Sequence, residues 1–223
     1  MKLLINQPGR HGDILICLPI AFWYAKKPYN HKVEWLCPKE YHPLFRNIDY
    51  VCPTDVLDSS YGRIIDLSFG LNTDTAIHKC WMASRPTWQS FVSMKYHLAQ
   101  VPISYRWNLV WNRNIKKELA LYDKITSRYG DRYAVVHETT WDSQNVIGTP
   151  LSKVLFEPID DFNIFDWYTV LLKAEEIHCI DSSLCNFVDV IPSLHSTKKF
   201  YYATPKVPSQ EDRTILINNW RFV

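Results

Sequence analysis

Short apolar runs alternate with longer apolar or amphipathic segments along most of the chain. The short runs predict strands, because a strand buried on both faces of a parallel sheet is apolar at nearly every position. They cover residues 2–6, 32–37, 50–52, 63–68, 133–136, 153–156, 177–180 and 199–203. The longer segments predict helices or helical turns at residues 14–27, 38–47, 87–100, 116–130, 164–176 and 181–191. This alternation is typical of an α/β fold with parallel sheets.

The strand–turn–helix plan that opens the chain occurs again from Tyr133 onward. Gly130, just before it, suits the left-handed exit of a helix. We therefore expect two small Rossmann-like lobes facing one cleft, an N-terminal lobe of residues 1–130 and a C-terminal lobe of residues 131–223. A chain of 223 residues has room for two lobes of this size.

The composition narrows the functional classes. Hydrophobic residues make up 47% and charged residues 22% of the chain, as in a globular protein with a real core. The 25 basic and 23 acidic residues leave a net charge of +2, which is too small to hold nucleic acid or an anionic membrane by charge alone. The aromatic share of 14% favours a ligand-binding protein, because flat rings pack against sugars and bases.

Two features of the sequence indicate where in the cell the protein works. The longest apolar stretch, Ile14–Ala25, contains Pro19 and is too short to span a bilayer as a helix. It also lacks the flanks of a signal peptide. The six cysteines include no CxxC pair, which favours a reducing compartment. We expect a soluble, cytoplasmic protein with no integral membrane segment, and no pattern specifies its oligomeric state.

The first candidate for chemistry is the loop of residues 8–13 between the first strand and the first helix. Open α/β sheets bind ligands at the carboxyl ends of their strands, and glycines in this loop permit a close backbone approach. The loop has neither the GxGxxG nor the GxxxxGK[ST] pattern of dinucleotide or ATP sites. Asp13 has two interpretations at this point: it is a general base, or it is only the N-cap of the following helix.

The second candidate is the turn in which the strand at 177–180 gives way to a helix. Asp181, Ser182 and Ser183 occupy this turn, and a helix N-terminus offers unpaired N–H groups to an anion such as a diphosphate. The alternative is a helix capped by serine without any ligand. A serine-hydrolase elbow would need GxSxG, which is absent.

The third candidate is the polar segment that follows the strand at 133–136. His137, Thr139 and Thr140 stand there at a carboxyl strand end, and Glu157 follows the strand at 153–156 and is placed to hold ribose hydroxyls. The alternatives are a hydrogen-bonded histidine at a strand end and a solvated loop carboxylate.

The sequence disfavours a metal site. His78 and Cys80, and His178 and Cys179, lack the spacing of zinc ligands. Asp160 and Asp161 are adjacent, so they do not form the DxD triplet that grips magnesium in many sugar-nucleotide enzymes. We expect no metal and no cofactor.

Three segments together resemble the heptosyltransferase-like glycosyltransferases of the GT-B fold, the family that includes the ADP-heptose:lipopolysaccharide enzymes. Gly12-Asp13-Ile14-Leu15 with Leu18-Pro19 is similar to the family's GDxxxxxP opening. Tyr61–Leu67 is similar to its fourth-strand segment, and Ala174–Ser183 to the segment that ends in DSG. The chain departs from the family's DSGxxH, because Ser183 replaces the glycine and Asn186 the histidine.

The resemblance implies a metal-independent inverting transferase with a nucleotide sugar as co-substrate and a glycan or other hydroxyl compound as acceptor. Asp13 would be the base that removes the acceptor proton, and Arg10, His11 and Gly12 would aid acceptor or phosphate binding. The second lobe would bind the donor. The candidate donor-binding residues are His137, Thr139, Thr140, Glu157, Asp181, Ser182, Ser183 and Asn186.

Two other classes of function remain open from the sequence. The first is a non-catalytic relative that binds a nucleotide or glycan, which the short second lobe suggests. The second is another sugar-nucleotide enzyme such as an epimerase. Turnover that needs an acceptor would indicate a transferase. A ligand-induced rise in melting temperature without turnover would indicate the non-catalytic relative, and turnover without an acceptor would indicate an epimerase.

Overall fold

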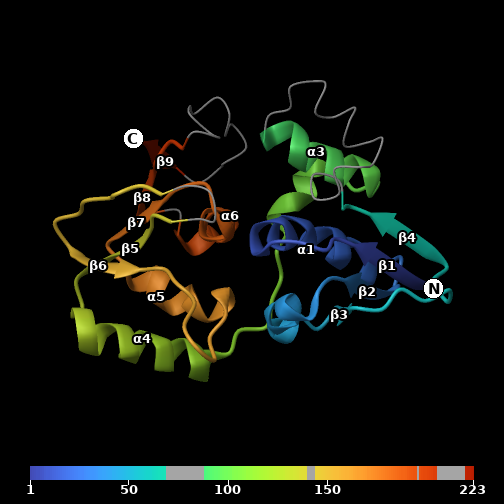
Figure 1. Cartoon of the computed structure of the whole chain (residues 1–223), viewed down its shortest axis with the longest axis horizontal. Coiled ribbons are helices and arrows are strands. Elements are labelled where there is room, and N and C mark those ends of the chain that lie inside the picture. The colour runs from blue at the N-terminus through green and yellow to red at the C-terminus, as the bar shows by residue number, and fades with distance from the viewer. Residues whose placement is uncertain (69–87, 140–143, 195, 205–218) are drawn as a thin grey trace. The chain divides into compact units, whose positions relative to one another are not determined.

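The computed structural model describes residues 1–68, 88–139, 144–194, 196–204 and 219–223. The chain divides into two compact units, Met1–Asn112 and Arg113–Val223 (Figure 1). Each unit is built around its own parallel sheet.

The first unit contains a four-stranded sheet in the order β3-β2-β1-β4, with every pair parallel. Its strands are β1 (Lys2–Asn6), β2 (Lys32–Leu36), β3 (Val51–Thr54) and β4 (Arg63–Asp66). The middle of β1 is fully buried, which explains its continuous apolar run. The chain moves outward from β1 through β2 to β3 and then returns to the other side of β1 for β4. The strand order therefore reverses between β1 and β4.

Four helical elements among the described residues accompany this sheet. They are α1 (His11–Ala25), the 3-10 helix η1 (Lys39–Asn47), α3 (Trp88–Leu98) and the 3-10 helix η2 (Ile103–Trp107). The Tyr96 hydroxyl of α3 donates to the Ile16 carbonyl of α1 over 2.9 Å. The Tyr24 hydroxyl of α1 donates to the Ala99 carbonyl just beyond α3 over 2.5 Å. These buried hydrogen bonds fix α3 against α1.

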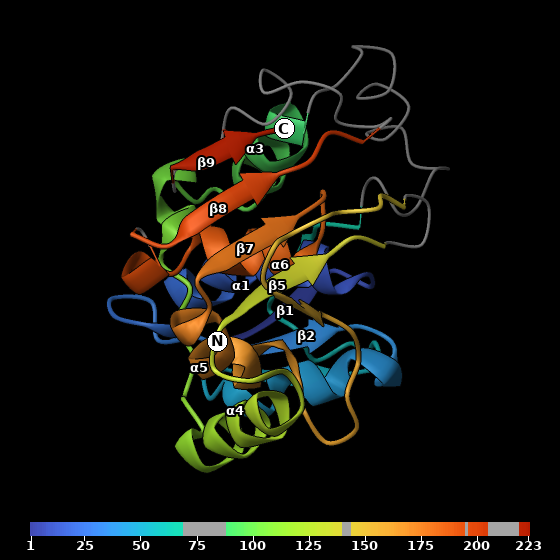
Figure 2. The same ribbon diagram turned by 90° about the vertical axis from the view of Figure 1, so that its left-hand side faces the viewer.

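The second unit contains a five-stranded parallel sheet in the order β6-β5-β7-β8-β9. Its strands are β5 (Tyr133–His137), β6 (Ser152–Leu155), β7 (Glu176–Cys179), β8 (Lys198–Tyr201) and β9 (Trp220–Phe222). Figure 2 shows β5, β7, β8 and β9 running in the same direction. Here the strand order reverses between β5 and β7.

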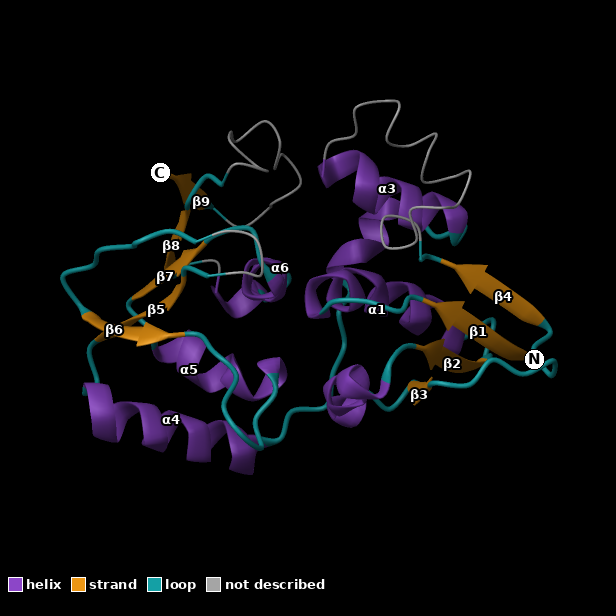
Figure 3. Cartoon of the chain, viewed as in Figure 1, coloured by secondary structure: helices purple, strands orange, loops and turns teal. Residues whose placement is uncertain are grey.

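The helices of the second unit are α4 (Ile115–Tyr129), η3 (Ile164–Trp167), α5 (Tyr168–Lys173), α6 (Ser183–Asp189) and η4 (Pro192–Leu194). Figure 3 shows α4 and α5 on the same side of the sheet. Gly130 ends α4 with φ 79°, in the left-handed conformation expected of a glycine at this place. The α/β prediction is confirmed in both units.

The units meet at residue 112 rather than at the predicted boundary near Asp131. Helix α4 belongs to the second unit because its buried Glu118 accepts a hydrogen bond from the Thr169 hydroxyl of α5 over 2.7 Å. Arg113 also pairs with Glu118. Asn112 bonds instead to Asn47 of the first unit, from its N–H to the Asn47 carbonyl over 2.7 Å.

The segment predicted as one helix from 164 to 176 has three parts. A 3-10 turn, η3, begins at a capping box in which Asn163 and Asp166 satisfy each other's backbone N–H groups. Helix α5 follows and ends at Lys173. Glu176 is already the first residue of β7. The apolar face continues from the helix into the strand, so periodicity alone did not show where the helix ends.

Candidate functional site

Asp13 lies in the first turn of α1, at the carboxyl end of β1. It is not the N-cap: the helix begins at His11, and Arg10 holds the capping position without a side-chain capping bond. The interpretation of Asp13 as a cap is therefore wrong. The helix starts earlier than the apolar pattern indicates, because the polar loop itself supplies the first turn. Asp13 exposes 9% of its surface, so its carboxylate is held within the unit beside the positive helix end.

A polar cluster surrounds the carboxyl ends of β1 and β4, where the strand order reverses. The Asn6 side-chain amide donates to Asp66 Oδ1 over 3.1 Å, and the Ser68 N–H donates to the same oxygen over 3.0 Å. The Leu67 N–H donates to the Asn6 carbonyl over 2.8 Å. Ligands of open α/β sheets bind at such a reversal, so Asp13 stands where the fold favours a site.

Sequence reasoning missed Lys95, which joins this cluster from α3. Its side chain is fully buried, and Nζ donates to the Leu67 carbonyl over 2.7 Å. A signal was present, because Lys95 follows the apolar Val92 by three residues and precedes the apolar Ala99 by four, the spacing of one helix face. A charged residue in an apolar stripe indicates a buried polar site.

The remaining predicted residues of this loop are accessible. Arg10 and His11 are exposed, and Gly12 is half-buried. The His11 ring packs edge-on against Tyr41, with 5.2 Å between ring centroids. Partial desolvation lowers the pKa of His11, so the ring is mostly neutral near pH 7.

Arg10 adopts a backbone conformation that favours glycine, with φ 39° and ψ 136°. A non-glycine residue in this region costs on the order of 1–3 kcal/mol. We expect Arg10→Gly to stabilise the first unit by about 1 kcal/mol relative to Arg10→Ala, because both lack the guanidinium and only glycine relieves the strain. Urea unfolding of the two variants checks this. Equal stability of the two would show that the loop relaxes without cost.

In the second unit, the carboxyl ends of β5 and β7 lie together where the strand order reverses. His137 at the end of β5 is paired in register with Cys179, and the Ile180 N–H donates to the His137 carbonyl over 3.1 Å. The polar turn that begins at Asp181 therefore follows directly beside the residues after His137. The structure brings these two candidate segments to one place on the sheet edge.

His137 is held in its neutral form. Burial lowers its pKa to about 4, against which a backbone hydrogen bond at Thr139 acts weakly. Its ring packs edge-on against Phe156, with 5.1 Å between centroids. A neutral imidazole at this position can bind a ligand through a hydrogen bond but carries no charge near pH 7.

The depressed pKa of His137 makes the second unit sensitive to acid. The unfolded chain, with a histidine pKa of 6.5, binds more protons than the folded unit as the pH falls from 6.5 toward 4, so stability falls through this window. Between about pH 7.5 and about pH 5 we expect this group to remove about 2 kcal/mol. His137→Phe, which keeps a ring against Phe156, should lose less stability over that range when urea unfolding is measured. An identical pH dependence in the variant would contradict the assignment.

The other candidates after β5 have different surroundings. Glu138, between His137 and Thr139, is tied to Lys153 Nζ at 2.6 Å and accepts the Ile147 N–H over 3.1 Å, so it stabilises the loop. Thr139 is exposed and forms an isolated bridge with Gln144. Thr140 lies outside the described residues.

The turn before α6 combines a cap with accessible polar groups. Ser182 is the N-cap of α6, and its hydroxyl accepts a hydrogen bond from the Cys185 N–H over 3.3 Å. For Ser182, the structure therefore shows the capping role that the sequence offered as the alternative to ligand binding. Asp181 and Ser183 on either side are half-buried. Asn186 exposes only 4% of its surface within α6, so its side chain belongs to the interior of the unit. The structure thus leaves Asp181 and Ser183 as the accessible members of the predicted donor turn.

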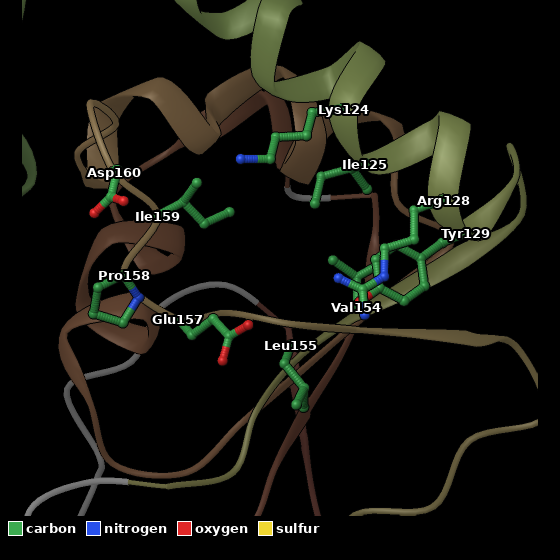
Figure 4. A pocket seen from close by; sticks show the side chains of 10 residues that line it. All are labelled: Lys124, Ile125, Arg128, Tyr129, Val154, Leu155, Glu157, Pro158, Ile159 and Asp160. Atoms are coloured by element: carbon green, nitrogen blue, oxygen red, sulfur yellow. The ribbon is translucent and has the colours of Figure 1, made fainter.

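Glu157 lines a pocket of about 280 Å³ between the end of β6, the loop after it and the C-terminal half of α4 (Figure 4). Lys124 and Arg128 line it from α4, and Ile125, Leu155 and Ile159 supply apolar surface. Phe156, next to Glu157, packs on His137, which joins this pocket region to the end of β5. Glu157 is exposed, in the position after its strand that the sequence indicated.

Among the described residues, no three His, Cys, Asp or Glu side chains are grouped closely enough to hold a metal ion. No helix within the described ranges has both the length and the apolar character needed to cross a bilayer.

Comparison with known proteins gives matches in structure but not in sequence. No family model and no curated protein sequence matches the chain. The glycosyl transferase family 9 structure from Veillonella parvula matches with a TM-score of 0.60 at 9% identity, over 100% of this chain and 86% of that one. E. coli heptosyltransferase WaaC with ADP-2-deoxy-2-fluoro heptose matches with a TM-score of 0.52 at 14% identity, over 100% and 93%.

The same enzyme with ADP matches with a TM-score of 0.50 at 14% identity, over 92% of this chain and 88% of that one. These identities are too low to transfer an activity, but the coverage extends over both units. The matches confirm that the chain has the fold expected from its sequence resemblance, the two-unit α/β fold of the heptosyltransferase-like glycosyltransferases.

Proposed function

We propose that the protein is a metal-independent inverting glycosyltransferase that moves a sugar from a nucleotide-sugar donor to a hydroxyl acceptor. The observation that carries this proposal is the place of Asp13, a nearly buried carboxylate at the strand-order reversal of the first sheet. Two similar structures hold ADP and an ADP-heptose analogue, which supports a nucleotide sugar as the donor.

In this mechanism the first unit binds the acceptor. Asp13 accepts the proton of the attacking hydroxyl as its oxygen forms a bond to the anomeric carbon. Attack from the face opposite the leaving group inverts the configuration of that carbon. The exposed Arg10 guanidinium stays cationic at any working pH and is available to an anionic group of the acceptor or the donor.

The second unit binds the donor. The bond between the anomeric carbon and the diphosphate breaks as the new glycosidic bond forms, so the leaving group gains charge. Backbone N–H groups and hydroxyls of the Asp181–Ser183 turn would stabilise that charge without a metal. Neutral His137 ends β5 beside the strand that leads into this turn, and Thr139 follows it. Glu157, in the loop after the neighbouring β6, offers a carboxylate to ribose hydroxyls.

The proposal is tested by incubating the protein with ADP-, GDP- and UDP-sugars and a panel of hydroxyl acceptors. Release of nucleoside diphosphate that depends on the acceptor is the expected result. Failure of every donor and acceptor combination, in a protein whose melting temperature shows that it is folded, would exclude transferase activity.

A second function, binding of a nucleotide without turnover, is favoured by one observation. Two members of the predicted donor turn serve the helix itself, because Ser182 caps it and Asn186 is buried in it. A rise in melting temperature with ADP, GDP or UDP, without diphosphate release from any nucleotide sugar, would support this function. Conversion of the nucleotide sugar without an acceptor would point to an epimerase-type enzyme.

A further inference from the structure

The pocket beside β6 carries charged side chains that the proposed transfer does not use. Lys124 and Arg128, one helical turn apart on α4, line one wall. Asp160 lines the other wall, in the loop that follows β6. Figure 4 shows the Lys124 side chain extending from α4 into the pocket, with Ile159 and Asp160 across from it. Cations and a carboxylate therefore line the same pocket from different elements.

These charged side chains do not pair with one another. Within the described part of the chain, the side chains of Lys124, Glu157 and Asp160 form no hydrogen bond and no ion pair. The Arg128 guanidinium lies 5.2 Å from the centre of the Tyr129 ring, a contact that leaves its N–H groups available. All four charged residues are exposed. Their donors and acceptors are therefore available to a ligand.

The loop that forms the second wall is tied to α4. The Lys117 ammonium group, in the first turn of α4, donates to the Asp161 carbonyl. The Phe162 N–H donates to the Ile159 carbonyl over 3.1 Å and closes a turn within the loop. The same helix thus carries one wall and anchors the other. A pocket that is formed before its ligand arrives binds with a smaller entropic cost.

The position of the pocket fits the nucleoside end of the donor. In the strand order β6-β5-β7, the turn proposed for the diphosphate follows β7, and Glu157, proposed for the ribose, follows β6 at the sheet edge. A nucleotide that runs in this direction carries its base beyond the ribose, into the pocket that Glu157 lines. The volume of about 280 Å³ is below the roughly 300–1,000 Å³ of sites for whole drug-sized ligands, so it suits one part of a nucleotide.

The charges of the pocket specify which base it suits. Lysine and arginine side chains only donate hydrogen bonds, and ionised carboxylates only accept them. Guanine presents two adjacent acceptors, O6 and N7, on one edge and two adjacent donor atoms, N1 and the 2-amino nitrogen, on another. Adenine has one amino group and uracil one N–H, so neither presents two adjacent donor atoms to a carboxylate. Of the three bases, guanine matches both walls.

We propose that this pocket binds the base of the donor and selects guanine: Lys124 and Arg128 donate to O6 and N7, and Asp160 accepts from N1–H and the 2-amino group. This inference rests on the proposed function in taking Glu157 as the ribose ligand. Ile125 and Ile159 supply apolar surface to the faces of the ring. The donor is then a GDP-sugar.

The test compares the binding of GDP, IDP, ADP and UDP by isothermal titration calorimetry. IDP keeps O6 and N1–H but lacks the 2-amino group. GDP should bind about tenfold more tightly than IDP, because its amino group bonds to a charged carboxylate. In Asp160→Ala this difference should disappear, whereas the matched control Asp123→Ala, on α4 and not in the pocket lining, should keep it. An unchanged difference in Asp160→Ala would overturn the proposal.

Lys124→Met tests the other edge of the base. GDP and IDP both carry O6, so their affinity should fall about tenfold. ADP carries an amino group at the corresponding carbon, so its affinity should not fall. An equal loss for all four nucleotides would show that Lys124 does not read the base, and would overturn the proposal. The substituted side chains are exposed, so the variants should keep the melting temperature of the wild type.

The outcomes separate this inference from the proposed function. Tighter binding of ADP or UDP than of GDP would overturn the selection of guanine and leave nucleotide-sugar transfer standing. If none of the four nucleotides bound the folded protein, the donor-binding role of the second unit would be overturned, and the guanine pocket with it.

Discussion

Replacing Asp13 with asparagine should lower the rate of glycosyl transfer by about 10²–10⁴-fold, the usual contribution of a general base. The amide has nearly the shape of the carboxylate but does not accept the acceptor proton. The rate is measured as nucleoside diphosphate released from whichever nucleotide sugar the protein uses. Circular dichroism and the melting temperature should show that both units remain folded.

The control for this prediction is Asp123→Asn, on α4 of the second unit. Asp123 is exposed and lies far along the chain from the β1–α1 loop, so its replacement should leave the rate unchanged. If Asp13→Asn transferred sugar as fast as the wild type, another group would have to be the base. The polar cluster at the end of β1 would then be structural only.

Replacing Arg113 with alanine should lower the free energy of unfolding of the second unit by about 3–5 kcal/mol near pH 7. Arg113 donates two hydrogen bonds to Glu118, over 3.0 and 2.6 Å, and its guanidinium lies 4.2 Å from the centre of the Tyr168 ring. The Glu118 side chain is 1% exposed. Without Arg113 a buried carboxylate keeps only the Thr169 hydroxyl as a side-chain partner, and an uncompensated buried charge is costly.

Two measurements test this prediction. Urea unfolding gives the change in stability, and hydrogen exchange of α4 and α5 locates it in the second unit.

The matched control is Arg132→Ala. Arg132 forms a similar bidentate ion pair with Glu175, with hydrogen bonds of 2.7 and 3.3 Å, but the two side chains are 79% and 41% exposed. An exposed ion pair stabilises little, so this variant should unfold almost as the wild type does. If Arg113→Ala were no less stable than Arg132→Ala, the Thr169 hydroxyl would satisfy Glu118 by itself.

All eight strands that the sequence predicted begin within one residue of a strand in the structure. Lys2–Asn6 forms β1 with the predicted bounds, and the strands near 133 and 177 lie within one residue of their predicted starts. Burial on both faces leaves an uninterrupted apolar run, which the sequence shows directly. Strand β9, Trp220–Phe222, was not predicted, because three residues carry no periodic pattern and only pairing with β8 defines them.

The candidate site was predictable in part for the same reason. A glycine-containing loop after the first strand identified Asp13, since chain order alone places that loop at a carboxyl strand end. The start of α1 at His11 and the position of Lys95 at this end of the sheet were harder to predict from the sequence. Lys95 reaches the Leu67 carbonyl at the end of β4 only because β4 pairs with β1 and α3 packs on α1, across long separations in sequence.

The sequence by itself determined the alternation of strands and helices, the loop that carries Asp13 and the turn that carries Asp181, because these depend on neighbouring residues. Only the tertiary structure decided which sheet α4 joins, which backbone group Lys95 bonds to, and which polar residues remain accessible to a ligand. Local pattern fixes how a segment folds and which of its faces is apolar. The order of strands in a sheet decides what that face meets, and this order comes from packing of segments distant in the chain.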